Sequence, residues 1–184
     1  QKIVSTVIET IAGTILPTSS SYSEVITDQD GNQYGIPKNT TKRQGIATGT
    51  VVQGVNLKTN EKVAIKRPHD KDLASRELLL QYEEKINHEA DVLSRLDHPN
   101  IPKLLAKTTL SEGYTVLIMP WIDGESLEEE IARGTLNIDE IERRFSPIAS
   151  AVDYAHSMGI AHEDIMVFSN IRQNMLLDWG IATT

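Results

Sequence analysis

Residues 159–184 read GIAHEDIMVFSNIRQNMLLDWGIATT, and this stretch decides how the whole chain is interpreted. Asp164 follows a histidine and a glutamate, Asn170 comes a few residues later, and Asp178 opens an Asp-Trp-Gly sequence. Short apolar runs typical of strands lie beside these polar residues. Magnesium prefers oxygen ligands, and phosphoryl transfer requires that phosphate charge is neutralised. Two aspartates and an asparagine in this setting therefore indicate a site for magnesium and phosphate.

Composition excludes several classes of protein. The chain has 184 residues, 39% of them apolar, which is enough to bury one core or two small lobes. A formal net charge of -8 argues against a nucleic-acid partner, because binding to a phosphate backbone needs clustered Lys and Arg. The absence of cysteine excludes disulfides and thiolate metal sites and is compatible with a reducing compartment. No run approaches the roughly 20 apolar residues of a membrane span. We expect a cytoplasmic protein.

Turn signals organise the first third of the chain. Residues 1–40 have a Ser/Thr-rich start and turn signals at Asp30-Gly31 and Pro37 around one short strand, which predicts an N-terminal extension and linker. Residues 49–67 contain two alternating apolar runs around a Thr-Asn-Glu sequence, the pattern of a β-hairpin.

Helical and strand patterns then alternate. Apolar residues at threes and fours predict a helix that stops before His98, and its apolar positions are Leu78, Ile86, Ala90, Leu93 and Leu96. Residues 114–122 read as a buried strand, 126–134 as a short helix, and 139–157 as the longest helix. Strands, a helix, strands and then helices indicate an α+β fold.

Lys66 and Glu89 are the strongest candidates for chemistry in the first half. Lys66 ends the strand VAIK, whose pleat places it on the same side as Ala64, and Glu89 lies in the predicted helix. A lysine and a glutamate facing each other from a strand and a helix can orient an ammonium toward phosphate oxygens. The alternatives are a solvated lysine on a strand and a solvated glutamate on a helix face. The joint occurrence of the two residues favours the functional interpretation.

Several segments together resemble the eukaryotic-like protein kinase family from about Gly45 to Ala182. In family order they are GTVV, VAIK, HEADVLSRLDHPNI, LIMPWIDGESL, IASAVDYAHSMGIAHED and LLDWGIA. The resemblance implies a bilobal fold, with an antiparallel-sheet N-lobe carrying one helix (αC) and a truncated helical C-lobe. We place the N-lobe at residues 41–122 and the partial C-lobe at 123–184.

The resemblance also implies ATP and magnesium as cofactors and a role for each site residue. Lys66, held by Glu89, would reach the α- and β-phosphates, and Asp164 would orient the hydroxyl of a protein substrate. Magnesium would bind Asp178, with Asn170 as a second ligand. The residues implied to hold the nucleotide are Gly45, Gly49, Val51, Ala64, Lys66, Met119, Pro120 and Ile122.

Within this set, the resemblance gives the adenine base its own contacts. Met119 would be the gatekeeper, and the Pro120 carbonyl and the Ile122 N–H would pair with the base. A proline is tolerable there because only an acceptor is required of it. Four residues are expected to stack behind the site: Leu93, Leu104, His162 and Trp179. We interpret His162 as a satisfied core histidine rather than a catalyst.

The glycine-rich loop and the catalytic loop depart from the family pattern. Gln44 and Ile46 stand where the family has glycines, so we expect weaker or slower nucleotide binding. Glu163 replaces an arginine that grips a phosphorylated activation loop, which argues against control by such phosphorylation. Met166 stands in place of a lysine that steadies the γ-phosphate.

The asparagine is also displaced. The family register places the metal-binding asparagine at Ser169, whereas the asparagine itself is Asn170. Either a bulge brings Asn170 into place or Ser169 substitutes weakly. The chain ends four residues after Gly180, which is compatible with a truncated chain or with a minimal kinase of the bacterial effector type, secreted into a host cytosol.

Three functions remain open from the sequence. The first is an ATP- and magnesium-dependent protein kinase of the Ser/Thr type, not regulated by an activation loop. The second is a pseudokinase that serves as a docking module, and the third is a small-molecule phosphotransferase. VAIK and HPNI favour a protein kinase over the third function, and retention of all four core charges favours the first over the second.

Overall fold

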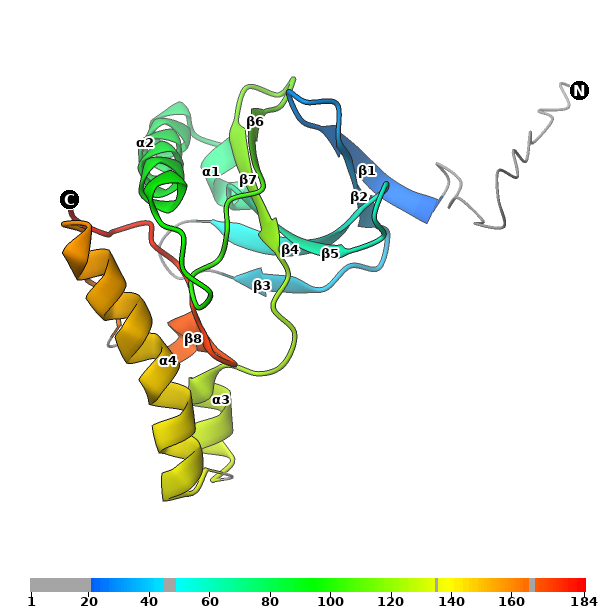
Figure 1. The fold of residues 1–184 in the computed structure, drawn as a ribbon. Helices are drawn as coiled ribbons and strands as arrows, with labels where there is room; N and C mark the ends of the chain where they lie inside the picture. The colour runs from blue at the N-terminus through cyan, green and yellow to red at the C-terminus, as the bar shows by residue number, and fades with distance from the viewer. Residues whose placement is uncertain (1–20, 45–48, 135, 166–167) are drawn as a thin grey trace, which may run out of the picture.

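The computed structural model describes residues 21–44, 49–134, 136–165 and 168–184. These residues form two parts, a curved antiparallel sheet with helix α2 beside it and a smaller part that contains α3 and α4 (Figure 1). The strands run in the order β1-β2-β4-β5-β7-β6, and β3 also pairs with β4. Their bounds are β1 Tyr22–Thr27, β2 Gln33–Pro37, β3 Lys42–Gln44, β4 Thr50–Asn56, β5 Lys62–Arg67, β6 Ala106–Thr109 and β7 Thr115–Pro120.

The β4–β5 hairpin is where the sequence predicted it. The Asn56 side chain accepts hydrogen bonds from the amides of Lys58 and Thr59, and Asn60 adopts a φ of 60°, so the turn chemistry is local. Alternation along β5 sends Val63 and Ile65 into one apolar cluster. The residues between and after them, which include Lys66, therefore face the opposite side of the sheet.

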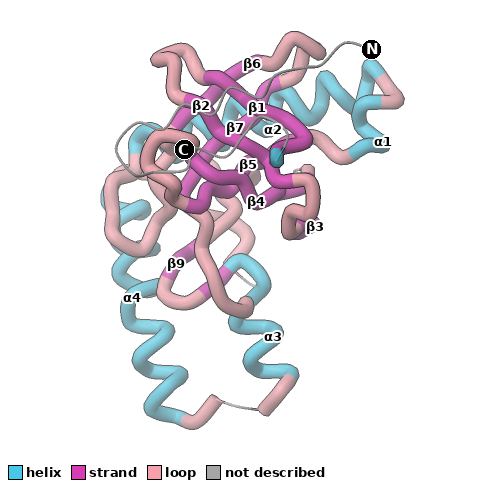
Figure 2. The backbone as a smooth tube through the Cα atoms, turned by 90° about the vertical axis from the view of Figure 1, so that its right-hand side faces the viewer, coloured by secondary structure: helices cyan, strands magenta, loops and turns pink. Residues whose placement is uncertain are grey.

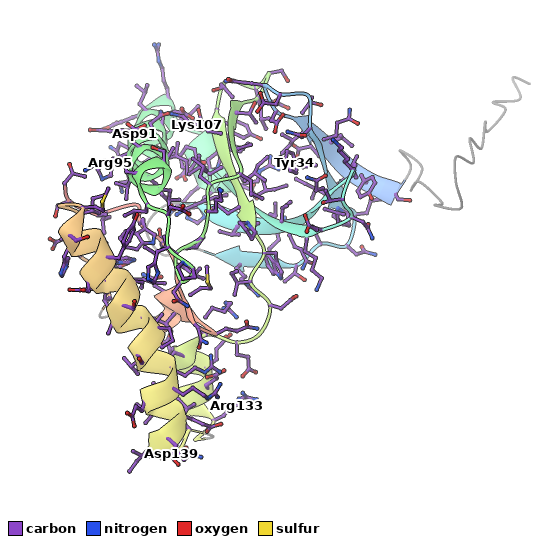
Figure 3. The ribbon with its side chains drawn as sticks, viewed as in Figure 1. Tyr34, Asp91, Arg95, Lys107, Arg133 and Asp139 are labelled. Carbon is purple, nitrogen blue, oxygen red and sulfur yellow. The ribbon has the colours of Figure 1, made fainter. Side chains whose placement is uncertain are left out.

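A hairpin inside residues 1–40 extends the sheet. Strands β1 and β2 pair antiparallel, and β2 pairs with β4 through Tyr34 and Gly35. The side chain of Asp28 organises the turn, because it accepts hydrogen bonds from the amide of Asn32 at 2.8 Å and from the Tyr34 hydroxyl at 3.1 Å (Tyr34 is labelled in Figure 3). Residues 22–37, which we expected to belong to an extension and linker, are thus part of the sheet.

Helix α2 (Arg76–Arg95) follows the short α1 (Asp70–Leu73) and packs against β7. Ser75 caps its N-terminus by accepting a hydrogen bond from the Leu78 amide. The predicted apolar positions are buried except Leu78, which is exposed beside this cap. Glu89 lies on the same buried face, so α2 carries a carboxylate toward the sheet.

The smaller part consists of two capped helices and a short hairpin. Helices α3 (Leu127–Ala132) and α4 (Ile138–Ser157) each begin with a capping box, at Ser126 and Asn137. Strands β8 (Ile171–Arg172) and β9 (Met175–Leu176) form a hairpin between these helices and the sheet, directly after the 3-10 turn η2 (Phe168–Asn170) (Figure 2). Within the described ranges, no helix combines the length and apolar character that crossing a bilayer requires.

Candidate functional site

Three charged side chains meet where the two parts of the molecule face each other. The Lys66 ammonium on β5 donates to Glu89 Oε1 at 2.9 Å and Oε2 at 2.7 Å, and to Asp178 Oδ1 at 2.8 Å. Lys66 and Glu89 are 3% and 1% exposed, so neither is the solvated residue that the alternative reading required. Burial lowers the pKa of Lys66, but the two carboxylates outweigh this effect, and the net pKa is raised above its usual value. The ammonium is therefore charged and held in one place.

A cavity of about 520 Å³ opens beside this ion triad. Its size is typical of sites for small ligands. The predicted site residues that line it are Val51, Ala64, Lys66, Glu89, Met119, Pro120, Ile122, Asn170 and Asp178. They come from β4, β5, α2, the end of β7 and the segment around β8. The structure thus gathers most of the residues that the resemblance implied.

Strand pairing explains how the residues expected to contact the base come together. Val51 pairs with Lys66 across β4 and β5, and Ala64 pairs with Met119 across β5 and β7. Adjacent strands in register place these side chains on one face of the sheet. Pro120 is the last residue of β7, and it also lines the cavity. As a proline it has no N–H to donate to a neighbouring strand.

The loop around Asp164 is tied to the Asp-Trp-Gly segment by His162. The amide of Asp164 donates to His162 Nδ1 at 3.2 Å, so the other ring nitrogen carries the proton that is donated to the Leu177 carbonyl at 3.0 Å. The ring also packs edge-on against Trp179 at a centroid distance of 4.5 Å. Burial lowers the pKa of His162 below its ordinary value. His162 is a neutral, satisfied core residue, as we interpreted it.

Asn170, the displaced asparagine, makes the contacts that orient this loop. Its Nδ2 donates to Asp164 Oδ2 at 3.0 Å, and its carbonyl accepts from the Leu177 amide at 2.7 Å. Ser169 also lines the cavity. Because the amide nitrogen of Asn170 is used by Asp164, its Oδ1 is the atom that can face a cation.

The donor set around Asp178 fits magnesium better than a transition metal. Asp178 supplies carboxylate oxygens and Asn170 an amide oxygen, and both line the cavity. Magnesium usually keeps waters and takes phosphate oxygens, so two protein ligands suffice. Across the described ranges, no group of three or more His, Cys, Asp or Glu side chains could hold a metal.

Not every predicted residue reaches the cavity. Gly49 is buried and does not line the cavity. Its backbone packs closely against β5: its φ is 94°, and a Cβ atom there would lie 2.3 Å from the Arg67 carbonyl oxygen. Asp164 lies next to Asn170 outside the cavity lining. Gly45 and two of the substituted positions, Ile46 and Met166, lie outside the described residues.

The expected stack behind the site is present. Leu93 and Trp179 are buried together with Met119 in one apolar cluster, and Leu104 packs against that cluster from the loop before β6. His162 joins through its contact with Trp179. Behind the ion triad there is therefore a continuous packed core.

Sequence reasoning missed several polar residues that also line the cavity: Lys42, Arg43, Ser126, Glu128, Glu129 and Arg172. One signal was available for Arg172. Ile171 points into the core, so its neighbour on a two-residue strand must point to the other side, toward the cavity.

The model of the protein kinase domain family matches residues 44–184. The chain therefore belongs to the protein kinase family, as the sequence motifs indicated. Its structure is similar to the crystal structure of Rad53 1-466 in complex with AMP-PNP, with a TM-score of 0.66 and 24% identity over 80% of this chain and 39% of that chain. This likeness confirms the bilobal α+β fold.

One similar protein is a probable serine/threonine-protein kinase by name, and another is a protein kinase by name. The chain is 35% identical over 133 residues to "Probable serine/threonine-protein kinase MARK-C" of Dictyostelium discoideum, which covers 71% of this chain and 16% of that protein. It is 32% identical over 128 residues to "CBL-interacting protein kinase 12" of Oryza sativa subsp. japonica, which covers 70% of this chain and 22% of that protein. The chain thus spans only a small share of the length of these relatives.

Proposed function

We propose that this chain is the nucleotide-binding core of a Ser/Thr-type protein kinase that uses ATP and magnesium. The observation that carries the proposal is the buried triad of Lys66, Glu89 and Asp178 at the inner end of a ligand-sized cavity. Family membership and the names of the relatives support the reaction class. The substrate is then a protein hydroxyl.

The chain's own residues divide the work of the transfer. Lys66 directs its ammonium toward phosphate oxygens, and Glu89 holds this ammonium through both carboxylate oxygens, so the ammonium would stay in place if Asp178 held magnesium. Asp164 accepts the proton of the attacking hydroxyl, whose oxygen bonds to the γ-phosphorus while the bond to the bridging oxygen breaks. Magnesium, when bound, neutralises phosphate charge. Position and charge, rather than covalent chemistry, supply the rate enhancement.

The decisive experiment is a calorimetric titration of the chain with ATP, with and without magnesium. We expect an affinity that magnesium increases in the wild type and does not increase in Asp178→Ala, because this substitution removes the carboxylate of the metal site. Incubation with radiolabelled ATP, magnesium and a cell lysate then tests transfer, with Asp178→Ala as the inactive control. Negligible heats under both conditions would remove the enzymatic proposal and leave a docking module.

A further inference from the structure

Arg43 joins two elements that strand pairing does not connect. It lies on β3, a three-residue strand whose sheet neighbour, among the strands that the structure describes, is β4. Its Nη1 donates to the Ile122 carbonyl at 2.9 Å, and its Cζ lies 3.8 Å from the centre of the Trp121 ring. Both partners belong to the segment that directly follows β7. A single side chain therefore ties β3 to this segment.

Trp121 offers Arg43 an anchored surface. The residue is 8% exposed, its amide donates to the Lys62 carbonyl of β5 at 3.2 Å, and its indole Nε1 donates to Asp123 Oδ1 at 3.2 Å. A guanidinium group stacks on an aromatic face and keeps the donors in its own plane for a carbonyl oxygen at the same time. Arg43 makes both kinds of contact, so the tie has two components that point to the same segment.

The charge of Arg43 persists although the side chain is partly buried. Burial, together with the nearby charge of Arg172, lowers the pKa of Arg43 to about 10. The guanidinium is therefore still protonated at neutral pH, and its attraction to the face of the Trp121 ring is retained.

The tie lies among the residues that are expected to hold the base. Arg43 pairs with Val51 across β3 and β4, and Arg43, Val51, Pro120 and Ile122 line the same cavity. Val51 was expected to contact the nucleotide from one strand of the sheet, and the Ile122 N–H from the segment after β7. Arg43 connects these two sides directly, through its backbone pairing with Val51 and its side-chain bond to Ile122.

We propose that Arg43 is a positioning residue that holds these two sides of the cavity together and thereby slows the release of a bound nucleotide. This inference rests on the proposed function, in which a nucleotide occupies the cavity. A site whose walls are already fixed loses less conformational freedom when it binds a ligand. Among variants of one binding site, affinity differences arise mostly in the rate of dissociation. We therefore expect Arg43 to affect dissociation more than association.

Stopped-flow displacement of fluorescent N-methylanthraniloyl analogues of ATP and ADP from the whole chain, with magnesium present, tests the proposal. Arg43→Leu is expected to raise the dissociation rate constant about tenfold, which is about 1.4 kcal/mol. Arg43→Lys keeps the charge but loses the planar fork, so it should raise the rate constant by less. The factor should be the same for both nucleotides, because the tie consists of protein groups only.

Substitutions of Trp121 distinguish a positioning role from a direct contact between Arg43 and the nucleotide. Trp121→Leu removes the aromatic face and should also accelerate dissociation, whereas Trp121→Phe keeps such a face and should have a smaller effect. In the Trp121→Leu background, Arg43→Leu should add clearly less than its tenfold effect in the wild type. Two residues that act through one contact are not additive in this way.

Arg133→Leu is the matched control. Arg133 is an exposed arginine directly after α3, its partner is Glu125, and it is not among the residues that line the cavity (Figure 3). Its replacement should leave both dissociation rates unchanged. Urea unfolding shows whether each variant is folded, and if Arg43→Leu is not, Arg43→Lys and Trp121→Leu provide the same comparison.

The outcomes separate this inference from the proposed function. An unchanged dissociation rate in a folded Arg43→Leu overturns the inference and leaves the kinase proposal standing. The inference is also overturned by full additivity with Trp121→Leu, or by a much larger effect on the ATP analogue than on the ADP analogue, because either result indicates a direct contact. A wild type that binds neither nucleotide overturns both.

Discussion

Replacement of Lys66 by methionine tests whether the buried ion triad also holds the fold together. Methionine keeps most of the length of the side chain and removes the ammonium. Glu89 is then left 1% exposed without its cation, whereas Asp178, with a side chain 19% exposed, retains some contact with water. The main penalty therefore arises at Glu89.

Removal of one partner of a buried ion pair typically costs about 3–5 kcal/mol of unfolding free energy, because the other charge remains buried. We expect a loss in that range for Lys66→Met. In the double variant Lys66→Met/Glu89→Leu the stranded carboxylate is gone. Since a buried pair replaced by apolar residues of similar volume is often near neutral, the double variant should recover most of the loss.

Urea unfolding measures these values directly. Trp121 and Trp179 are the two tryptophans of the chain and both are buried, so their fluorescence reports unfolding. Lys62→Met is the matched control, because Lys62 lies on the same strand and pairs with Asp123 through side chains that are 54% and 59% exposed. Such an exposed pair is screened by water and contributes little to stability.

Acid provides a second readout of the same variant. Without the ammonium, the folded state of Lys66→Met holds Glu89 with a pKa above its unfolded value, because a buried carboxylate resists ionisation. The folded state then binds more protons than the unfolded state. The variant should therefore regain stability as the pH falls through the raised pKa of Glu89 in the folded state toward its unfolded pKa. The reasoning is refuted if Lys66→Met costs no more than Lys62→Met, or if Glu89→Leu recovers nothing in the Lys66→Met background.

Three further predictions follow from the structure. Asn170→Ala should reduce phosphoryl transfer roughly ten- to a hundredfold, and Ser169→Ala should do little; the opposite order in a rate assay would place the metal ligand at Ser169. The unfolding free energy should fall as the pH drops below about 6.5, by up to about 1.4 kcal/mol per pH unit. The reason is that His162 becomes protonated in the unfolded state, whereas burial lowers its pKa in the folded state and keeps the ring neutral. Urea titrations across pH should show a shallower dependence for His162→Gln, and an unchanged slope would contradict this assignment. Gly49→Ala should lower the unfolding free energy by about 2 kcal/mol or more, since its φ is 94° and a Cβ would meet the neighbouring strand. Gly113→Ala, with open space around it, should lower it by only about 1 kcal/mol. Thermal or urea unfolding measures both.

Much of the site was predictable because its geometry follows from short-range periods. A strand alternates sides, so VAIK places Ala64 and Lys66 together, and a helix with an apolar stripe presents Glu89 on that stripe. These two local patterns do not by themselves say that α2 packs against the sheet, which is what brings lysine and glutamate into contact. The resemblance to the family supplied this information.

The unpredicted features depend on contacts that local patterns do not encode. Turn signals at residues 28–32 were visible, but whether the resulting hairpin joins a sheet depends on a distant strand, here β4. Charged residues on short strands are usually solvated, so Arg43 and Arg172 carried no signal as a pair. They come together only because each donates a hydrogen bond to the segment that follows β7.

The position of Asp178, the proposed metal ligand, depends on the displaced asparagine Asn170. Asp178 and Glu163 have φ values of 61° and 66°, a conformation that is costly for residues other than glycine and must be imposed by neighbours. The neighbours are identifiable: Leu177, directly before Asp178, donates to the Asn170 carbonyl and accepts from His162. Asn170 therefore acts through two groups, because its side chain holds Asp164 and its backbone holds the residue before Asp178. We infer that a shift of one residue in the sequence can be accommodated, because Asn170 connects to Asp164 through its side chain and to Leu177, the residue before Asp178, through its carbonyl.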